Sequence, residues 1–347
     1  MTDNGRHRDR AADRRRTTDR GASRDRADGP GTPVDRESAG ELFESLLDRE
    51  TVFEDKELLR PSHTPDLLPH REGQIAQLAE HLGATLRGDA PSNVQIYGKT
   101  GTGKTVCVKY VTQELIRAAG TTAVPCRVEY VNGEVTDTQY RVFASLTNRI
   151  ATADGEREGD RPVPVSGWPT GRVYRAFVRA VDALDRGVVV VLDEVDKLVR
   201  RDAGDALYKL LRVNADLERS HVSVVGISND LTFTDALDPR VRSSLGDAEI
   251  VFPPYDGLQL RDILRVRASA AFRDGRVTDG VIPLCAAFAA REHGDARRAL
   301  DTLRVAGEVA DAAGADRVEE HHVRRARERA DAAGADREVT DRSSGRT

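Results

Sequence analysis

Cysteines and long apolar runs are scarce in this sequence. The three cysteines, Cys107, Cys126 and Cys285, lie far apart, with no Cys-x-x-Cys pair and no histidine at metal-ligand spacing. This pattern argues against a disulfide framework or a zinc site and favours buried thiols in a reducing compartment. No apolar run approaches the roughly 18 residues that a membrane-spanning helix needs. The Arg/Asp-rich beginning of the chain also lacks the apolar segment of a secretory signal. We therefore expect a cytoplasmic protein without a membrane partner.

A strong excess of either charge is also missing. The formal net charge is -5, from 53 basic and 58 acidic residues. Such a balance gives no overall attraction to nucleic acid, so any nucleic-acid surface must be a local patch.

The length of 347 residues leaves room for about two domains. Apolar residues make up only 39% of the chain and charged residues 32%, which indicates that part of the length is solvated tail. We predict disordered tails at residues 1–40, which are rich in Arg, Asp, Gly, Thr and Ser, and at residues 331–347. Between them we expect an α/β domain over residues 57–252 and a helical domain over residues 253–330.

One short stretch has the pattern G-x-x-x-x-G-K-[ST] of a phosphate-binding loop. It follows Asn93–Tyr97, an apolar run that predicts a strand, and it consists of Gly98, Lys99, Thr100, Gly101, Thr102, Gly103, Lys104 and Thr105. Its glycines allow the backbone to turn so that successive N–H groups face a polyphosphate, while the helix that begins near Gly103 adds its positive end. Lys104 would reach the β- and γ-phosphates, and Thr105 would bind Mg²⁺. An ordinary glycine-rich turn between a strand and a helix is the alternative interpretation.

A second nucleotide motif follows about 90 residues later. Val188–Leu192 is a continuous apolar run, as expected of a strand buried on both faces of a parallel sheet, and it ends in Asp193 and Glu194. Asp193 is placed to hold Mg²⁺ opposite Thr105, and Glu194 can polarise water. A strand that simply ends in solvated acids is the alternative. Together the two motifs predict binding of ATP or ADP with Mg²⁺.

The remaining apolar patterns alternate between strands and helices up to a proline pair. Further strands are predicted at 124–131, 222–227 and 249–252, with amphipathic helices between the strands. This alternation predicts a five-stranded parallel sheet with helices on both sides and a ligand at the carboxyl ends of the strands. After Pro253-Pro254 only helical patterns follow, which predicts a small all-α lid.

Several segments together resemble the archaeal origin-recognition and cell-division-control type replication initiator ATPases of the AAA+ class. Besides the phosphate loop, they are Leu192–Leu198 (LDEVDKL), Leu237–Gly246 (LDPRVRSSLG) and Gly294–Leu300 (GDARRAL). The resemblance covers roughly residues 57–330, and the last two segments are its most specific part. It implies a slow ATPase used as a switch in DNA replication initiation, with origin DNA and initiator paralogues as partners.

The resemblance also implies roles for individual residues. Asn229 corresponds to the sensor-1 residue that positions the attacking water, and Arg297 corresponds to the sensor-2 arginine that reports the nucleotide state to the lid. Tyr255 and Arg267 match positions that line the nucleotide. Without the family, Arg297 could equally be a solvated helix residue. A lid arginine at the phosphates would couple their charge to the domain angle.

Two features depart from relatives of this family. Arg240 and Arg242 are candidates for an arginine finger, but eukaryotic relatives place the finger where this chain has Ser244. Family members usually continue into a DNA-binding winged-helix domain, which we expect to be missing here because only about 17 residues follow the last predicted helix.

The expected lack of a winged helix leaves alternative functions open. The predicted helix over 137–150, with Arg141 and Arg149, resembles the initiator-specific helix and could contact DNA, or it could only pack on the sheet. The chain could accordingly be an initiator paralogue or a regulatory partner of a full-length initiator that has no sequence-specific DNA binding of its own. A transposition or helicase-loading ATPase shares the core, but has no reason to carry the Gly294–Leu300 segment.

Overall fold

The computed structural model describes residues 50–344, apart from residues 90–91, 123, 137, 154–161, 201–203 and 246–247. The tail expected at residues 1–40 lies outside the described residues. Within the described chain, no helix combines the length and the apolar character that crossing a membrane requires.

A five-stranded parallel sheet forms the centre of the first domain, and its strand order is β2-β3-β4-β1-β5. This confirms the five-stranded parallel sheet that the sequence predicts. Its strands are β1 (Val94–Tyr97), β2 (Cys126–Asn132), β3 (Gly187–Asp193), β4 (His221–Ser228) and β5 (Ala248–Val251).

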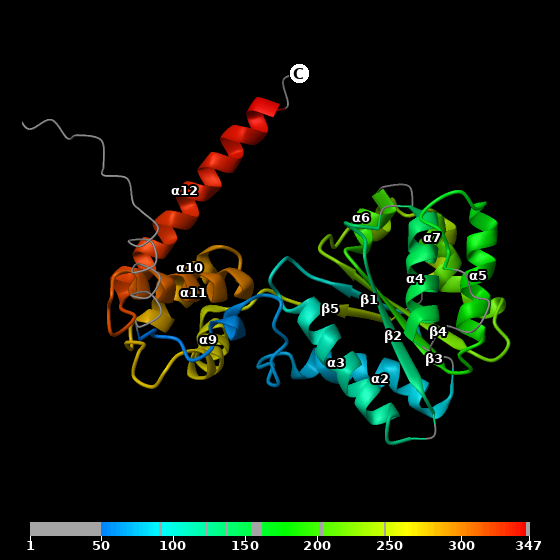
Figure 1. Ribbon diagram of the computed structural model, residues 1–347, viewed down its shortest axis with the longest axis horizontal. Coiled ribbons are helices and arrows are strands. Elements are labelled where there is room, and N and C mark those ends of the chain that lie inside the picture. The colour runs from blue at the N-terminus through cyan, green and yellow to red at the C-terminus, as the bar shows by residue number, and fades with distance from the viewer. Residues whose placement is uncertain are drawn as a thin grey trace, which may run out of the picture. The chain divides into compact units, whose positions relative to one another are not determined.

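Helices cover both faces of this sheet (Figure 1). One face packs against α2 (Glu72–Leu82) and α3 (Lys104–Ala119), and the other against α4 (Gln139–Ala153), α5 (Thr170–Asp182), α7 (Gly204–Arg212) and α8 (Pro239–Ser244). Shorter segments complete the domain: η2 (Gly83–Arg87), α6 (Val195–Leu198), η4 (Val213–Ala215) and η5 (Phe233–Ala236). In β3, Val190 lies in the core of one face and Val191 in that of the other, which explains why this strand is apolar at successive positions.

The register of the strands brings their carboxyl ends to a single edge. Asn132 of β2 pairs with Asp193 of β3, and Asp193 pairs with Ile227 of β4. Tyr97, which precedes the phosphate loop, pairs with Ser228. Chemical groups that follow four different strands therefore meet at one edge, which is where parallel α/β sheets bind ligands.

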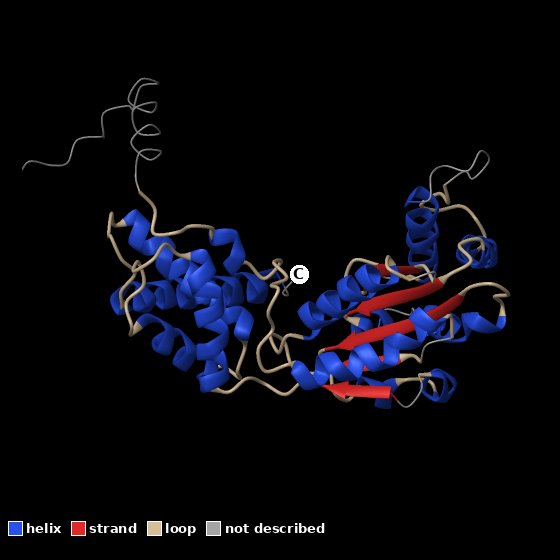
Figure 2. Cartoon of the chain, turned by 90° about the horizontal axis from the view of Figure 1, so that it is seen from below, coloured by secondary structure: helices blue, strands red, loops and turns tan. Residues whose placement is uncertain are grey.

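The second domain contains helices but none of the sheet strands (Figure 2). It comprises α9 (Gly257–Ala271), α10 (Val281–Arg291), α11 (Ala296–Ala312) and the beginning of α12 (Glu320–Ser344). Apolar residues from all four helices form its core, among them Leu264, Cys285, Leu303 and Val323. This is the all-α lid that the sequence predicts after Pro253-Pro254.

The first described residues pack on this lid. The Phe53 ring stacks on Phe272 with a centroid separation of 4.7 Å, and the Thr51 hydroxyl donates a 2.6 Å hydrogen bond to Asp311. Leu59, in the short helix η1 (Lys56–Leu59), is fully buried in the lid core. The lid thus includes residues 51–59, whereas the sequence assigns the chain from residue 57 to the ATPase domain. Isolated apolar residues in a sequence indicate burial, but they do not indicate the domain on which they pack.

Helix α12 continues to Ser344, although the sequence predicts a disordered tail from residue 331. The segment lacks apolar periodicity, on which that prediction rests. The segment has three alanines near its beginning, Ala332, Ala333 and Ala335, and alanine has the highest helix propensity, which favours continuation of the helix.

Candidate functional site

The phosphate-binding loop joins β1 to α3 and lies directly against the lid. Gly101 and Gly103 have φ values of 75° and 90°, a region that favours glycine. A β-carbon on Gly101 would overlap the Asp295 carboxylate, and one on Gly103 would lie 2.7 Å from the Tyr255 hydroxyl. The Gly101 carbonyl also accepts a 3.1 Å hydrogen bond from the Ala296 amide at the start of α11. The glycines therefore serve close contact with the lid as well as the turn.

The Lys104 ammonium lies at the centre of the loop. It donates hydrogen bonds to the Gly98 carbonyl at 2.6 Å, to the Lys99 carbonyl at 2.8 Å and to Asn229 Oδ1 at 2.8 Å. The side chain is buried, and this burial, together with the charge of Arg297, lowers the pKa of Lys104 to about 8. An anionic ligand at this position would stabilise the ammonium and raise the pKa again.

Thr105 and Asp193 lie side by side at the beginning of α3 and the end of β3. The Thr105 hydroxyl donates a 3.0 Å hydrogen bond to one Asp193 carboxylate oxygen, and the Glu194 amide donates to the other at 3.0 Å. Both side chains offer the hard oxygen ligands that Mg²⁺ prefers. In the described part of the chain, no cluster of three or more His, Cys, Asp or Glu residues could hold a metal by itself.

Asn229 is held by a residue that the sequence did not single out. Asp196 accepts a 3.0 Å hydrogen bond from the Ser228 hydroxyl and a 3.4 Å hydrogen bond from the Asn229 amide. Asp196 is buried, so these bonds fix the end of β4 against α6. Its position three residues after Asp193 was visible in the sequence, but nothing in the pattern indicated a partner 33 residues away.

Glu194 adopts a left-handed conformation, with φ 56° and ψ 44°, at the turn between β3 and α6. Its carboxylate forms a 3.0 Å ion pair with the ammonium of Lys197. Such a conformation costs a non-glycine residue on the order of 1 kcal/mol and is typical of functional sites.

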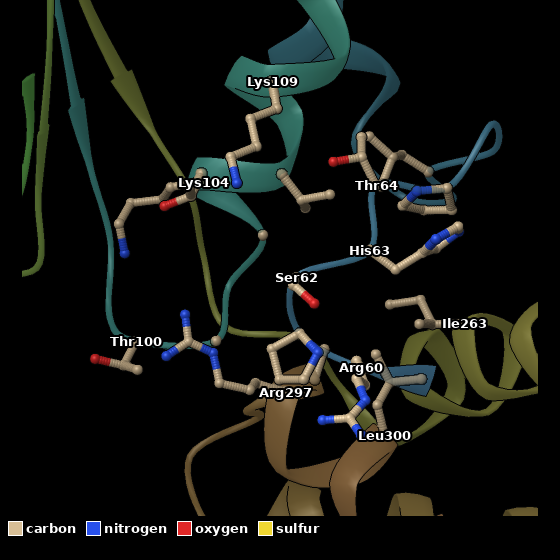
Figure 3. Close-up of a pocket in the computed structure, with 18 of the residues that line it drawn as sticks. Arg60, Ser62, His63, Thr64, Thr100, Lys104, Lys109, Ile263, Arg297 and Leu300 are labelled. Carbon is tan, nitrogen blue, oxygen red and sulfur yellow. The ribbon is translucent and has the colours of Figure 1, made fainter. Parts of the chain in front are cut away.

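These residues surround a cavity of about 440 Å³ between the sheet edge and the lid (Figure 3). Most of the expected site residues line it, namely Thr100, Gly101, Gly103, Lys104, Thr105, Asp193, Glu194, Asn229, Tyr255, Arg267 and Arg297. Figure 3 shows Arg297 extending from α11 toward the loop residue Thr100. The expected residues Gly98, Lys99 and Thr102 are not in the lining. The first two accept hydrogen bonds from Lys104, and the Thr102 hydroxyl donates to the Lys99 carbonyl at 2.8 Å.

The opposite wall of the cavity comes from an unexpected segment. Residues 60–65 and 67–69 line it, together with Ile263, Val266 and Leu300 of the lid. In Figure 3, Ser62 and His63 of this segment lie across the cavity from the loop, near Ile263. The only sequence signal was a run of prolines, which predicts an interruption of secondary structure but not a binding wall.

Tyr255 and Arg267 line the cavity from the side of the lid. Tyr255 is buried, which raises the pKa of its hydroxyl to about 12. Arg267 is only 6% exposed, and its Nε has no hydrogen-bond partner among the described residues. Burial lowers the pKa of Arg267. A buried guanidinium of this kind is suited to an anionic or polar ligand atom.

Arg71 connects the two domains and was missed by the sequence analysis. It is 2% exposed and stacks on Tyr255, with its guanidinium carbon 3.7 Å from the ring centroid. It donates hydrogen bonds to the carbonyls of Thr102 at 3.0 Å, His70 at 3.0 Å and Pro253 at 2.7 Å. The phosphate loop and the start of the lid are therefore bound to one side chain.

The candidate finger and DNA residues lie outside the cavity. Arg240 and Arg242 are exposed on α8 and form ion pairs with Asp238 at 3.1 Å and Asp235 at 2.7 Å. Helix α4 buries apolar side chains such as Phe143 on the sheet, and its Arg149 donates a hydrogen bond to the Tyr130 carbonyl. Packing is thus one role of this helix.

Comparison with known proteins identifies the class of this fold and site. Residues 67–225 match the family model of the AAA ATPase domain, and residues 261–328 match that of the Cdc6 AAA+ ATPase-type lid domain. The chain is an AAA+ phosphate-loop protein with a helical lid.

Individual relatives define the family more narrowly. The chain is 55% identical over 285 residues to an ORC1-type DNA replication protein of Thermococcus onnurineus. The matched region covers 82% of this chain and 68% of that protein. It is 51% identical over 342 residues to ORC1-type DNA replication protein 4 of Haloarcula marismortui, covering 86% of this chain and 65% of that protein. The chain belongs to the ORC1-type DNA replication protein family, and it spans about two thirds of the length of these relatives.

Solved structures give the same assignment. The Aeropyrum pernix ORC1 protein, solved in complex with DNA, superposes with a TM-score of 0.73 and 45% identity over 81% of this chain and 70% of that chain. The ORC2 protein of the same organism, solved as ADPNP-ADP complexes, gives a TM-score of 0.68 and 27% identity over 79% of this chain and 71% of that chain. The resemblance inferred from the sequence segments is confirmed.

Proposed function

We propose that this chain binds ATP with Mg²⁺ in the cavity between the sheet and the lid, hydrolyses it slowly, and uses the nucleotide state as a switch in DNA replication initiation. The main support for this proposal is a pair of hydrogen bonds at one edge of the cavity. Lys104 donates one to Asn229, and Thr105 donates the other to Asp193. The nucleotide complexes of the ORC2 relative support the proposal. The absence of disulfide patterns supports a cytoplasmic location.

Each of the cationic side chains contributes a different contact to nucleotide binding. Lys104 exchanges its two carbonyl partners for phosphate oxygens, which are stronger acceptors because they are charged. Arg297 reaches the phosphates from the lid, so that closure of the lid depends on the charge of the nucleotide. Arg267 satisfies its unpartnered Nε on the ligand. Thr105 and Asp193 hold Mg²⁺, which neutralises phosphate charge.

Two residues prepare the attacking water. Glu194 polarises it, and Asn229 orients it against the terminal phosphate once Lys104 has turned to the phosphates and released the amide oxygen. Both positions follow strand ends that the sheet register brings to the same edge.

The decisive experiment compares nucleotide binding and turnover in matched variants. Lys104→Ala removes the central ammonium and is expected to abolish retention of a fluorescent ATP analogue, as is Asp193→Ala. Glu194→Gln is expected to retain binding and to stop hydrolysis. Lys209→Ala, outside the cavity and over the Tyr174 ring, serves as the control with wild-type behaviour. Unchanged ATP binding in Lys104→Ala would refute the proposal.

DNA is the second proposed partner, because the Aeropyrum pernix relative was solved with DNA. A salt titration of binding to origin-proximal DNA, with ATP and with ADP, tests this partner and its coupling to the nucleotide. Origin-selective binding in the nanomolar range supports an initiator. Weak, strongly salt-dependent binding that ignores sequence instead favours a regulatory partner of another initiator.

A further inference from the structure

The carboxylate proposed to polarise water is not free in this structure. Glu194 Oε2 lies 3.0 Å from the Lys197 ammonium, one turn further along the chain. The same ammonium lies 3.1 Å from Glu134 Oε1. One lysine thus bridges two carboxylates, and both glutamates line the nucleotide cavity.

Backbone contacts hold the second carboxylate in place. The Gly133 amide donates a 2.8 Å hydrogen bond to the Asp193 carbonyl, and the Glu134 amide donates a 2.7 Å hydrogen bond to Asn132 Oδ1. A β-carbon on Gly133 would lie 2.5 Å from the Glu194 carbonyl oxygen, so only glycine allows the two segments to approach this closely. Glu134 is therefore held beside the Lys197 bridge by the loop after β2.

We propose that Lys197 is a positioning residue that restrains Glu194 in an ion pair, and that Glu134 competes for the same ammonium and thereby sets how much Glu194 can act on water. This inference rests on the proposed ATPase function. A carboxylate oxygen that lies 3.0 Å from an ammonium in an ion pair offers less effective negative charge to a water molecule. The ion pairs with Glu194 and Glu134 raise the pKa of Lys197, so its charge persists at neutral pH.

The competition predicts opposite effects of two substitutions. Lys197→Met releases Glu194 and is expected to raise kcat about two- to fivefold, the size of a partly exposed ion pair. Glu134→Gln removes the competing charge, strengthens the Lys197–Glu194 pair and is expected to lower kcat about twofold. Neither variant is expected to change the Kd for ATP. A purely structural role of the bridge would move both kcat values in the same direction.

Single-turnover ATP hydrolysis and binding of a fluorescent ATP analogue measure these quantities, with Lys209→Met as the matched control. A fall in kcat for Lys197→Met, or changes of the same sign in both variants, would overturn the proposal. If the wild type and all variants fail to bind ATP, the proposed function fails first, and the ion pair is then judged by a measurement that needs no nucleotide.

That second measurement is the rate at which Lys197 is acetylated in the full chain, with Lys209 as the internal reference. An amine reacts only when deprotonated, so loss of the ion pair increases its reactivity. Glu194→Gln is expected to raise the acetylation rate of Lys197 at least twofold relative to Lys209. An unchanged ratio would show that Glu194 does not hold Lys197 in solution and would refute the restraint.

Discussion

Replacing Arg71 with methionine removes the buried cation that connects the phosphate loop to the lid. The guanidinium donates three hydrogen bonds to backbone carbonyls, at 2.7 to 3.0 Å, and stacks on Tyr255. Hydrogen bonds from a charged donor contribute about 1.5–3 kcal/mol each. Burial of a guanidinium costs several kcal/mol, which offsets much of that sum. Methionine keeps a similar volume but leaves the carbonyls without this donor, so we expect a loss of about 2–4 kcal/mol in the free energy of unfolding.

The same substitution should weaken nucleotide binding. The Thr102 carbonyl that Arg71 holds belongs to the phosphate loop, and the Pro253 carbonyl lies at the start of the lid. Without this connection, the loop and the lid must be ordered by the ligand, at a cost in binding free energy. A reduction of about tenfold in affinity corresponds to roughly 1.4 kcal/mol.

Urea unfolding and titration with a fluorescent ATP analogue measure both effects. Arg87→Met is the matched control, because Arg87 is exposed and forms one ion pair with Asp89 at 3.3 Å; we expect it to change stability by less than about 0.5 kcal/mol. Arg71→Lys should lie between the wild type and Arg71→Met, since lysine keeps the charge but lacks the planar fork. An Arg71→Met protein with wild-type stability and affinity would refute the reasoning.

The site leads to four further predictions. Because burial lowers the pKa of Lys104 to about 8, ATP affinity should be constant below pH 8 and should fall by up to tenfold per pH unit above it. Titration with ATP at several pH values measures this dependence. An ATP affinity that stays constant up to pH 9 contradicts it. Over the same range the stability of the nucleotide-free protein should rise toward pH 10.5, because the unfolded state then binds more protons than the folded one. Gly101→Ala should lower the free energy of unfolding by more than about 1 kcal/mol in urea unfolding, because the new β-carbon would overlap Asp295 and because φ at residue 101 is 75°. An unchanged urea midpoint would show that the lid does not pack on the loop in solution. Asp196→Ala should lower kcat at least tenfold with a smaller change in ATP affinity, since it removes the bonds that hold Ser228 and Asn229 against α6. An equal kcat in single-turnover assays contradicts this positioning.

Local sequence patterns predicted the parts of the molecule whose physics is local. A continuous apolar run predicts a strand buried on both faces, and β3 has that environment, with Val190 and Val191 in opposite cores. The glycine spacing of the phosphate loop likewise reflects φ values that the loop itself requires. Since parallel strands share a carboxyl edge, the meeting of Thr105, Asp193 and Asn229 also followed from the order of strands.

Contacts between distant segments were not predictable in the same way. Arg71 precedes an amphipathic helix and looks like an ordinary solvated residue, yet its acceptors include Pro253, 182 positions away. Phe53 and Leu59 lack the periodicity of a helix or strand, so no sequence pattern predicts that they pack on the lid. Periodicity reports which side of an element is buried, but the partner is set by tertiary packing.

The same distinction applies to the bridge at Lys197. Its spacing of three residues from Glu194 favours an ion pair on one helical turn, which is a local inference. Glu134 joins them only because β2 and β3 pair in register, with Asn132 beside Asp193, and because Gly133 lets the following loop touch the Glu194 carbonyl. The local pair alone would leave the Glu194 carboxylate, which we propose polarises water, with a single ion-pair partner. The tertiary contact adds a second acceptor for the same ammonium, and this is what makes the restraint on Glu194 adjustable.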